Sequence, residues 1–122
     1  ADTVLWERAW EVTGLLIAEM SEDCRKNGAG FLVVNHPGTD QFYLTGKEQD
    51  PHLRASRLAQ QASQWGFEFV DLSPWFARDW SAHQARFEFA TDYHWNEHGH
   101  RVAAQALRDV VSEKLRNLLD SK

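Results

Sequence analysis

The sequence predicts an α/β protein in which long helices alternate with short parallel strands. Residues 31–34 and 67–72 form two short apolar runs, and a stretch with helical apolar spacing precedes each of them. A long helix is predicted between the two runs and another after them, and right-handed crossovers through such helices connect parallel strands. The predicted order is therefore helix, strand, helix, strand, helix.

The first helix is predicted over residues 4–26, and Asn27 with Gly28 marks its end. Its apolar residues recur at helical spacing; they are Leu5, Ala9, Val12, Leu16 and Met20. The strand at residues 31–34 is continuous and contains β-branched residues, so we expect both of its faces to be buried. The four residues that follow, 35–38, end this strand.

The middle of the chain predicts a loop followed by a second helix. Residues 39–49 are polar and are expected to form the loop. Asp50 is the predicted N-cap of the helix, and Pro51 its first residue. We expect the helix to end at about Trp65, because Gly66 follows it.

The second strand is predicted at residues 67–72, and Ser73 is interpreted as the cap of a short helical turn that runs through Phe76. Residues 77–93 are expected to be irregular. Asn96 is the predicted cap of a last helix with a charged outer face. The predicted apolar positions of that helix are Ala104, Leu107, Val111, Leu115 and Leu118.

Two strands make a poor parallel sheet, because open sheets usually contain about five or six. The chain is therefore expected either to be part of a larger fold or to complete its sheet with another copy. Exposed strand edges predict self-association or pairing with a partner segment.

Composition excludes several classes of protein. The 122 residues are 43% hydrophobic and 25% charged, which fits one globular domain over residues 1–122. No apolar run approaches the length of a membrane span, and no signal-peptide pattern is present, so the compartment stays open. The single Cys24 excludes a disulfide framework, and the net charge of −5 argues against a nucleic-acid partner. Six Trp in so short a chain indicate a deep core, a carbohydrate-lined cleft or apolar surface meant for another segment.

The densest polar cluster lies just before the last helix, at residues 91–100. In an extended segment Asp92 and His94 fall on the same side, so a bend in the loop brings the carboxylate onto a ring nitrogen. Such a carboxylate fixes the imidazole tautomer and leaves the other nitrogen as a general base. The spacing alone also fits an ordinary surface loop.

The string DYHWNEHGHRVAA at residues 92–104 resembles the last conserved block of the SGNH/GDSL hydrolase superfamily. That block supplies an Asp and a His just ahead of the terminal helix. The resemblance implies a flavodoxin-like α/β/α sandwich, a Ser-His-Asp triad and hydrolysis of acyl esters without a cofactor. It implies Asp92 as the orienting acid and His94 as the general base. Substrates of the superfamily include lipids, acyl thioesters and acetylated sugars.

Two departures from the superfamily pattern refine this reading. The usual spacing is Asp-x-x-His, whereas Asp-x-His is similar to relatives that acetylate exopolysaccharides, such as the alginate acetyltransferases. That similarity favours acyl transfer to or from sugars, outside the cytoplasm. The Gly-Asp-Ser block and the Gly and Asn blocks of the oxyanion hole are absent. The chain is therefore expected to be the C-terminal portion of such a domain and to pair with a missing N-terminal half.

Other residues are candidates for the nucleophile and for substrate contacts. Ser73 follows a strand end, although a helix cap explains it more simply. Asn35 and His36 also follow a strand and are predicted either to line the substrate cleft or to cap the loop. Trp75 is predicted either to stack on a sugar ring or to pack in the core.

Two other classes of function stay open from the sequence. A metal site at Asp92, His94 and His98 is one, because carboxylate and imidazole suit zinc. However, a helix that begins near Asn96 leaves His94 outside it, so the prediction is no metal. The other is a non-catalytic α/β binding or assembly module, in which the Asp and His form only a structural hydrogen bond. In that reading His98 and His100 occupy a first helical turn, with His100 partly buried.

Overall fold

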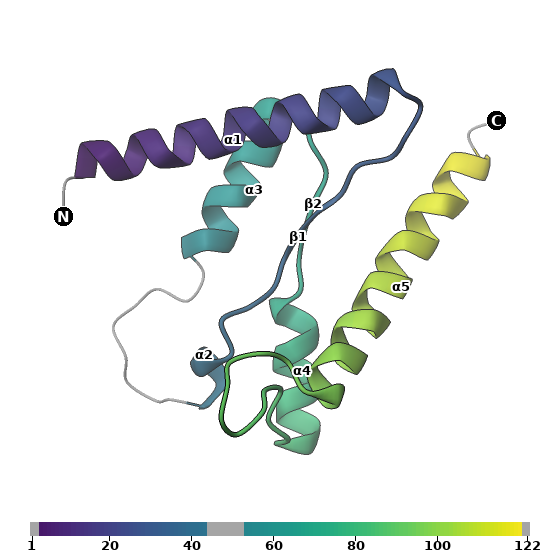
Figure 1. Cartoon of the computed structure of the whole chain (residues 1–122). Coiled ribbons are helices and arrows are strands. Elements are labelled where there is room, and N and C mark those ends of the chain that lie inside the picture. Colours follow the sequence, from purple (N-terminus) through teal and green to yellow (C-terminus); the bar gives the residue numbers. More distant parts are fainter. Residues whose placement is uncertain (1–2, 44–52, 121–122) are drawn as a thin grey trace. The chain divides into compact units, whose positions relative to one another are not determined.

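The computed structural model describes residues 3–43 and 53–120 (Figure 1). The elements in chain order are α1 (Thr3–Lys26), β1 (Val33–Asn35), α2 (Asp40–Tyr43), α3 (Leu53–Trp65), β2 (Phe69–Asp71), α4 (Ser73–His83) and α5 (Glu97–Asp120). The described residues form two compact units, 3–36 with 53–71 and 37–43 with 72–120, called here the first and the second unit. None of these helices is long and apolar enough to cross a membrane.

The first unit contains a two-stranded parallel sheet, as the sequence predicts. The strands pair Val33 with Phe69 and Asn35 with Asp71, and both are shorter than the apolar runs from which they were predicted. The expectation that both faces of the first strand are buried is wrong. Val34 is 39% exposed, because a strand face is buried only where a helix covers it.

Helices α1 and α3 pack against each other where α1 has a glycine. A Cβ on Gly14 would lie 2.8 Å from the Cδ atom of Gln61. The Gln61 amide donates to the Trp10 carbonyl oxygen, and Arg57 forms an ion pair with Glu7. This helix pair is therefore held by polar contacts around a close approach rather than by the predicted apolar stripe.

The helix ends of the first unit agree with the sequence. Gly28 and Gly66 adopt left-handed conformations, with φ of 69° and 76°, just after α1 and α3. Glycine accepts this conformation without steric cost, which is why both helices end there. The predicted start of the second helix, at Asp50 and Pro51, lies outside the described residues.

The second unit differs from the sequence prediction in its helices. Part of the predicted loop at residues 39–49 is α2, and α4 extends through Ser73–His83 where a short turn and an irregular segment were expected. The reason is tertiary, since Phe76 and Trp80 lie four residues apart and both contact Phe87 in the core. Ser73 is also not the cap, because that position belongs to Leu72, which makes no side-chain capping bond.

The core of the second unit is aromatic. Phe76, Phe87 and Leu72 are its largest fully buried side chains. Helix α5 contributes small residues to it; they are Gly99, Val102, Ala103 and Ala106. The apolar face predicted for this helix is wrong, because Leu115 and Leu118 are exposed.

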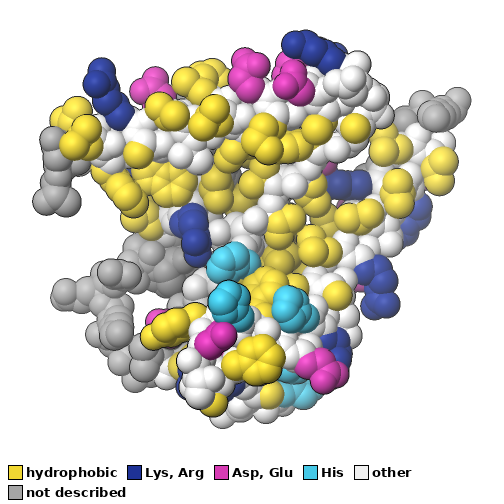
Figure 2. Space-filling view, viewed as in Figure 1, with side chains coloured by type: hydrophobic (Ala, Val, Ile, Leu, Met, Phe, Trp, Pro, Cys, Tyr) yellow, Lys and Arg dark blue, Asp and Glu magenta, His cyan; other side chains and the backbone are white. Residues whose placement is uncertain are grey.

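Many large apolar side chains stay exposed in both units. On α1 these include Val12, Leu16 and Met20, each more than half exposed. Figure 2 shows hydrophobic side chains gathered along this helix. The first helix therefore has the predicted apolar residues at helical spacing, but the described residues of the chain leave these side chains exposed.

The aromatic core generates a first prediction. Phe76→Ala removes a ring with 0% exposure and is expected to lower the free energy of unfolding by about 3–5 kcal/mol. The matched control is Phe89→Ala, because Phe89 is 56% exposed and should cost far less. Urea denaturation followed by circular dichroism measures both. Equal losses for the two variants would contradict this core.

Candidate functional site

Residues 86–96 form a hairpin between α4 and α5, called here the dyad hairpin. Its two sides meet at an antiparallel bridge between Glu88 and Trp95. The Phe89 N–H donates to the His94 carbonyl oxygen at 3.2 Å, and the Asp92 N–H donates to the Phe89 carbonyl oxygen at 3.4 Å. These bonds place Asp92 and His94 at the exposed tip of the hairpin.

The structure brings Asp92 and His94 into direct contact. The Oδ1 atom of Asp92 lies 2.8 Å from Nδ1 of His94 and also accepts the His94 backbone N–H. A carboxylate at Nδ1 holds the proton there and leaves Nε2 as the acceptor. The His94 side chain is 89% exposed, so that nitrogen is open to a reacting group. The geometry is that of a general base with an orienting acid.

The electrostatics of the pair follow from these bonds. The pKa of the Asp92 carboxyl is lowered, first by the backbone N–H of His94 and then by its ring. Because folding lowers this pKa, the contact favours the folded hairpin above the ordinary carboxyl pKa. It ceases to do so as the pH falls through the lowered value. The carboxylate is therefore charged throughout the neutral range in which a histidine base works.

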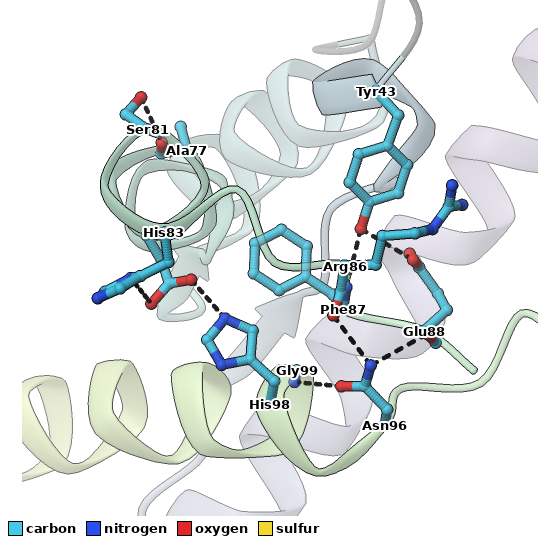
Figure 3. A network of polar contacts seen from close by, with 11 residues as sticks. Tyr43, Ala77, Ser81, His83, Arg86, Phe87, Glu88, Asn96, His98 and Gly99 are labelled. Atoms are coloured by element: carbon cyan, nitrogen blue, oxygen red, sulfur yellow. Dashed lines mark hydrogen bonds and ion pairs between the residues drawn. The ribbon is translucent and has the colours of Figure 1, made fainter. Parts of the chain in front are cut away.

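One asparagine joins the dyad hairpin to α5 (Figure 3). The Asn96 side-chain amide donates to the carbonyl oxygens of Arg86, at 2.9 Å, and Glu88, at 3.0 Å. Its side-chain oxygen accepts the Gly99 N–H at 3.0 Å, and its backbone N–H donates to the Phe87 carbonyl at 2.7 Å. The predicted helix cap is thus confirmed, and the same side chain also fixes the hairpin.

The approach of the hairpin to α5 requires a glycine. A Cβ on Gly99 would lie 2.5 Å from the Phe87 carbonyl oxygen and 3.0 Å from Cβ of Trp95. The Trp95 ring lies next to this contact, at 5.2 Å from the Phe76 ring and 5.7 Å from the His100 ring. His100 itself is exposed, which corrects the expectation that it is partly buried.

A second Asp–His contact, missed by sequence reasoning, lies between α4 and α5. Asp79 binds Nε2 of His98 at 2.6 Å and Nδ1 of His83 at 3.2 Å. The His98 ring stacks on Phe87 with 5.5 Å between centroids. Asp79 and His83 are four residues apart, a signal that is visible only once the segment is known to be helical.

This second contact bears on the metal alternative. His98 is bound to Asp79 rather than gathered with Asp92 and His94. Within residues 3–43 and 53–120, no group of three or more His, Cys, Asp or Glu side chains is placed to hold a metal ion.

The residues predicted to contact substrate lie in both units. Asn35 is buried and donates from its amide to Asp71 at 2.8 Å, so it joins the ends of the two strands. His36 is exposed, and its carbonyl oxygen accepts a bond from Arg54 at 3.4 Å. Trp75 is half-buried on α4. A substrate role for Asn35, His36 or Trp75 stays a prediction.

The internal nucleophile candidate has a poor environment. Ser73 is the first residue of α4 and only 8% exposed. A nucleophile needs access both to its base and to the substrate, and a residue with this little exposed surface is a poor fit to that need.

Comparison with known proteins gives one family. Residues 11–122 match the family described as SGNH hydrolase-like domain, acetyltransferase AlgX. No curated protein and no solved structure gives a match. The family match confirms the resemblance drawn from residues 92–104, and it includes both strands and the whole dyad hairpin.

The close approach at the start of α5 yields a second prediction. Gly99→Ala is expected to lower the free energy of unfolding by about 1–3 kcal/mol, because the new methyl group meets a backbone oxygen. Gly38→Ala is the matched control, since nothing lies within 4 Å of its added Cβ. Chemical denaturation of both variants is the measurement, and an unchanged stability for Gly99→Ala would refute the contact.

The asparagine clamp yields a third prediction. Asn96→Ala removes a helix cap and two bonds to carbonyl oxygens, so a loss of about 2–3 kcal/mol is expected. Asn117→Ala makes the same change at an exposed position of α5 and should leave stability nearly unchanged. Faster hydrogen exchange at the Gly99 amide in the Asn96 variant alone would locate the effect. Equal exchange in both variants would count against the clamp.

Proposed function

The chain belongs to the family of SGNH hydrolase-like domains described by acetyltransferase AlgX, and we propose that it supplies the acid–base pair of an acyl-transfer site. The observation that carries the proposal is the 2.8 Å contact of Asp92 with Nδ1 of His94, together with the exposure of the His94 ring. A base must be both oriented and open to its substrate, and this pair is both.

The proposed reaction has two stages. In the first, Nε2 of His94 takes the proton of a serine hydroxyl while the serine oxygen attacks the carbonyl carbon of an acyl ester. The tetrahedral intermediate collapses, and the His94 imidazolium gives its proton to the departing alcohol. An acyl-serine and a free alcohol result. Asp92 stabilises the imidazolium between these steps, and no cofactor takes part.

In the second stage an acceptor hydroxyl gives its proton to His94 and attacks the acyl-serine. The serine leaves and recovers the proton, so the site returns to its starting state. With water as acceptor the reaction is ester hydrolysis, and with a sugar hydroxyl it is O-acyl transfer. The acetyltransferase description of the family and the Asp-x-His spacing support transfer of acetyl groups to or from carbohydrate hydroxyls.

The serine belongs, in this proposal, to a segment outside residues 1–122. The burial of Ser73 supports this, because it disfavours the best internal candidate. The exposed apolar side chains of α1 support a related proposal, that the two parallel strands belong to a larger flavodoxin-like sandwich. Further strands and helices of the same domain would cover those side chains.

A serine-directed fluorophosphonate tests the proposal. In a longer polypeptide that contains this domain, we expect one adduct by intact mass, and we expect acetyl transfer from p-nitrophenyl acetate to an oligosaccharide. His94→Ala and Asp92→Asn should each lower the rate by about 10³–10⁴-fold, because each removes the oriented base. Asp109→Asn on the outer face of α5 is the control and should keep the full rate.

Two outcomes would overturn the proposal. One is a His94→Ala protein with the wild-type labelling rate. The other is a His94-dependent adduct on residues 1–122 alone, since the nucleophile would then lie within this chain.

A further inference from the structure

Tyr43, the last residue of α2, binds Phe87 and Glu88 at the end of the dyad hairpin opposite its tip (Figure 3). Its hydroxyl donates to Oε2 of Glu88 at 2.8 Å and accepts the Phe87 N–H at 2.9 Å. A phenol has one proton to donate, so Tyr43 uses its donor on one hairpin residue and an acceptor site on the next. Residues more than 40 positions apart in the chain are joined by this single oxygen.

The ring of Tyr43 is held on two sides. The Trp80 ring meets it edge-on with 4.8 Å between centroids, and the Arg86 guanidinium carbon lies 4.4 Å from the centroid of the Tyr43 ring. The ring therefore has little freedom to rotate away from the hairpin. Burial, more than any other cause, raises the pKa of Tyr43 to about 12, so its hydroxyl keeps its proton throughout the neutral range.

Glu88 depends on this tyrosine. Its side chain is buried, and its Oε1 atom has no hydrogen-bond partner. Its Oε2 atom accepts from Tyr43. A buried carboxyl with a single donor resists any movement that would break that bond, because the group would then be both buried and unpaired.

The path from Tyr43 to the dyad is short. Glu88 pairs with Trp95 across the hairpin, and the next residue, Phe89, donates to the His94 carbonyl oxygen. Fixing residues 86–88 therefore fixes the backbone that carries His94. Asn96 binds the same three residues from the α5 side.

We propose that Tyr43 is a positioning residue of the acyl-transfer site, which fixes the dyad hairpin so that Asp92 and His94 keep their contact. The inference rests on the proposed function for its catalytic meaning. Its structural part, the dependence of the Asp92–His94 contact on Tyr43, stands on geometry and is measured without turnover. Tyr43 touches neither substrate nor the reacting atoms.

The first experiment follows the Asp92 carboxyl by carbon NMR during a pH titration of the 122-residue chain. Tyr43→Phe removes only the hydroxyl and should move the pKa of Asp92 up from its lowered value toward that of an ordinary aspartate, because the His94 bonds loosen. Tyr93→Phe is the matched control. It makes the same change at a 92% exposed position beside Asp92, and the pKa should stay low.

A double variant protects the test against misfolding. Tyr43→Phe combined with Glu88→Gln removes the hydroxyl without leaving a buried carboxyl that has lost its one donor, and the same upward shift is expected. Glu88→Gln alone keeps an acceptor for the Tyr43 hydroxyl and should preserve the low pKa of Asp92. An unshifted Asp92 titration in a folded Tyr43→Phe or double variant overturns the proposal.

Activity measurements separate the role of Tyr43 from the proposed acyl-transfer function. In the active protein, Tyr43→Phe is expected to lower kcat by about 10- to 100-fold with little change in KM, because the base is misplaced while substrate contacts remain. A shifted Asp92 titration together with full activity of His94→Ala would keep the link from Tyr43 to Asp92 and reject the proposed function. An unshifted Asp92 titration in Tyr43→Phe, together with a loss of activity in His94→Ala, would reject the positioning role of Tyr43 and keep the proposed function.

Discussion

The second unit depends on the hydrogen bonds of one side chain, that of Asn96. Its oxygen caps α5 while its amide protons hold the backbone of the dyad hairpin, so the helix start and the hairpin cannot move independently. The contact is possible because Gly99 lets the Phe87 carbonyl oxygen come close to the first helical turn. A larger residue at position 99 would push the hairpin away from α5. Asn96 could then no longer cap the helix and bind the hairpin backbone at the same time.

The two Asp–His contacts of this unit show how surroundings decide chemistry. Asp79 and His98 are half-buried between α4 and α5, and Asp79 holds both His98 and His83. That pair joins helices. Asp92 and His94 lie at an exposed tip, where an ion pair contributes little to stability. The backbone beneath this exposed pair is bound on both sides, by Tyr43 at residues 87 and 88 and by Asn96 at residues 86–88.

The first unit has the opposite character. Its polar side chains pair with one another: Asn35 with Asp71 at the strand ends, Arg57 with Glu7 and Gln61 with the backbone between the helices. Its apolar side chains on α1 are largely exposed. These polar contacts are incomplete, because two buried polar atoms between the helices, Trp10 Nε1 and Gln61 Oε1, have no hydrogen-bond partner among the described residues. The described residues of this unit therefore leave the apolar side chains of α1 without a covering layer.

The sequence by itself determined the features that depend on local chemistry. Gly28 and Gly66 end helices because a left-handed residue is needed there, Asn96 caps a helix, and an Asp two residues before a His meets its ring. The parallel pairing of the two strands followed from the alternation of strands with long helices. The family was also readable, because its most specific block is contiguous.

Only the tertiary structure decided the rest. Helix α4 forms where a short turn and an irregular segment were predicted, because the rings of Phe76 and Trp80 pack against Phe87. Asp79 with His98 and Tyr43 with Glu88 are 19 and 45 residues apart, so no local pattern announces them. The burial of Ser73 and the bond of Asn35 to Asp71 on the neighbouring strand are likewise tertiary features. Local propensity is encoded within a few residues, whereas these contacts depend on which distant side chains share a core.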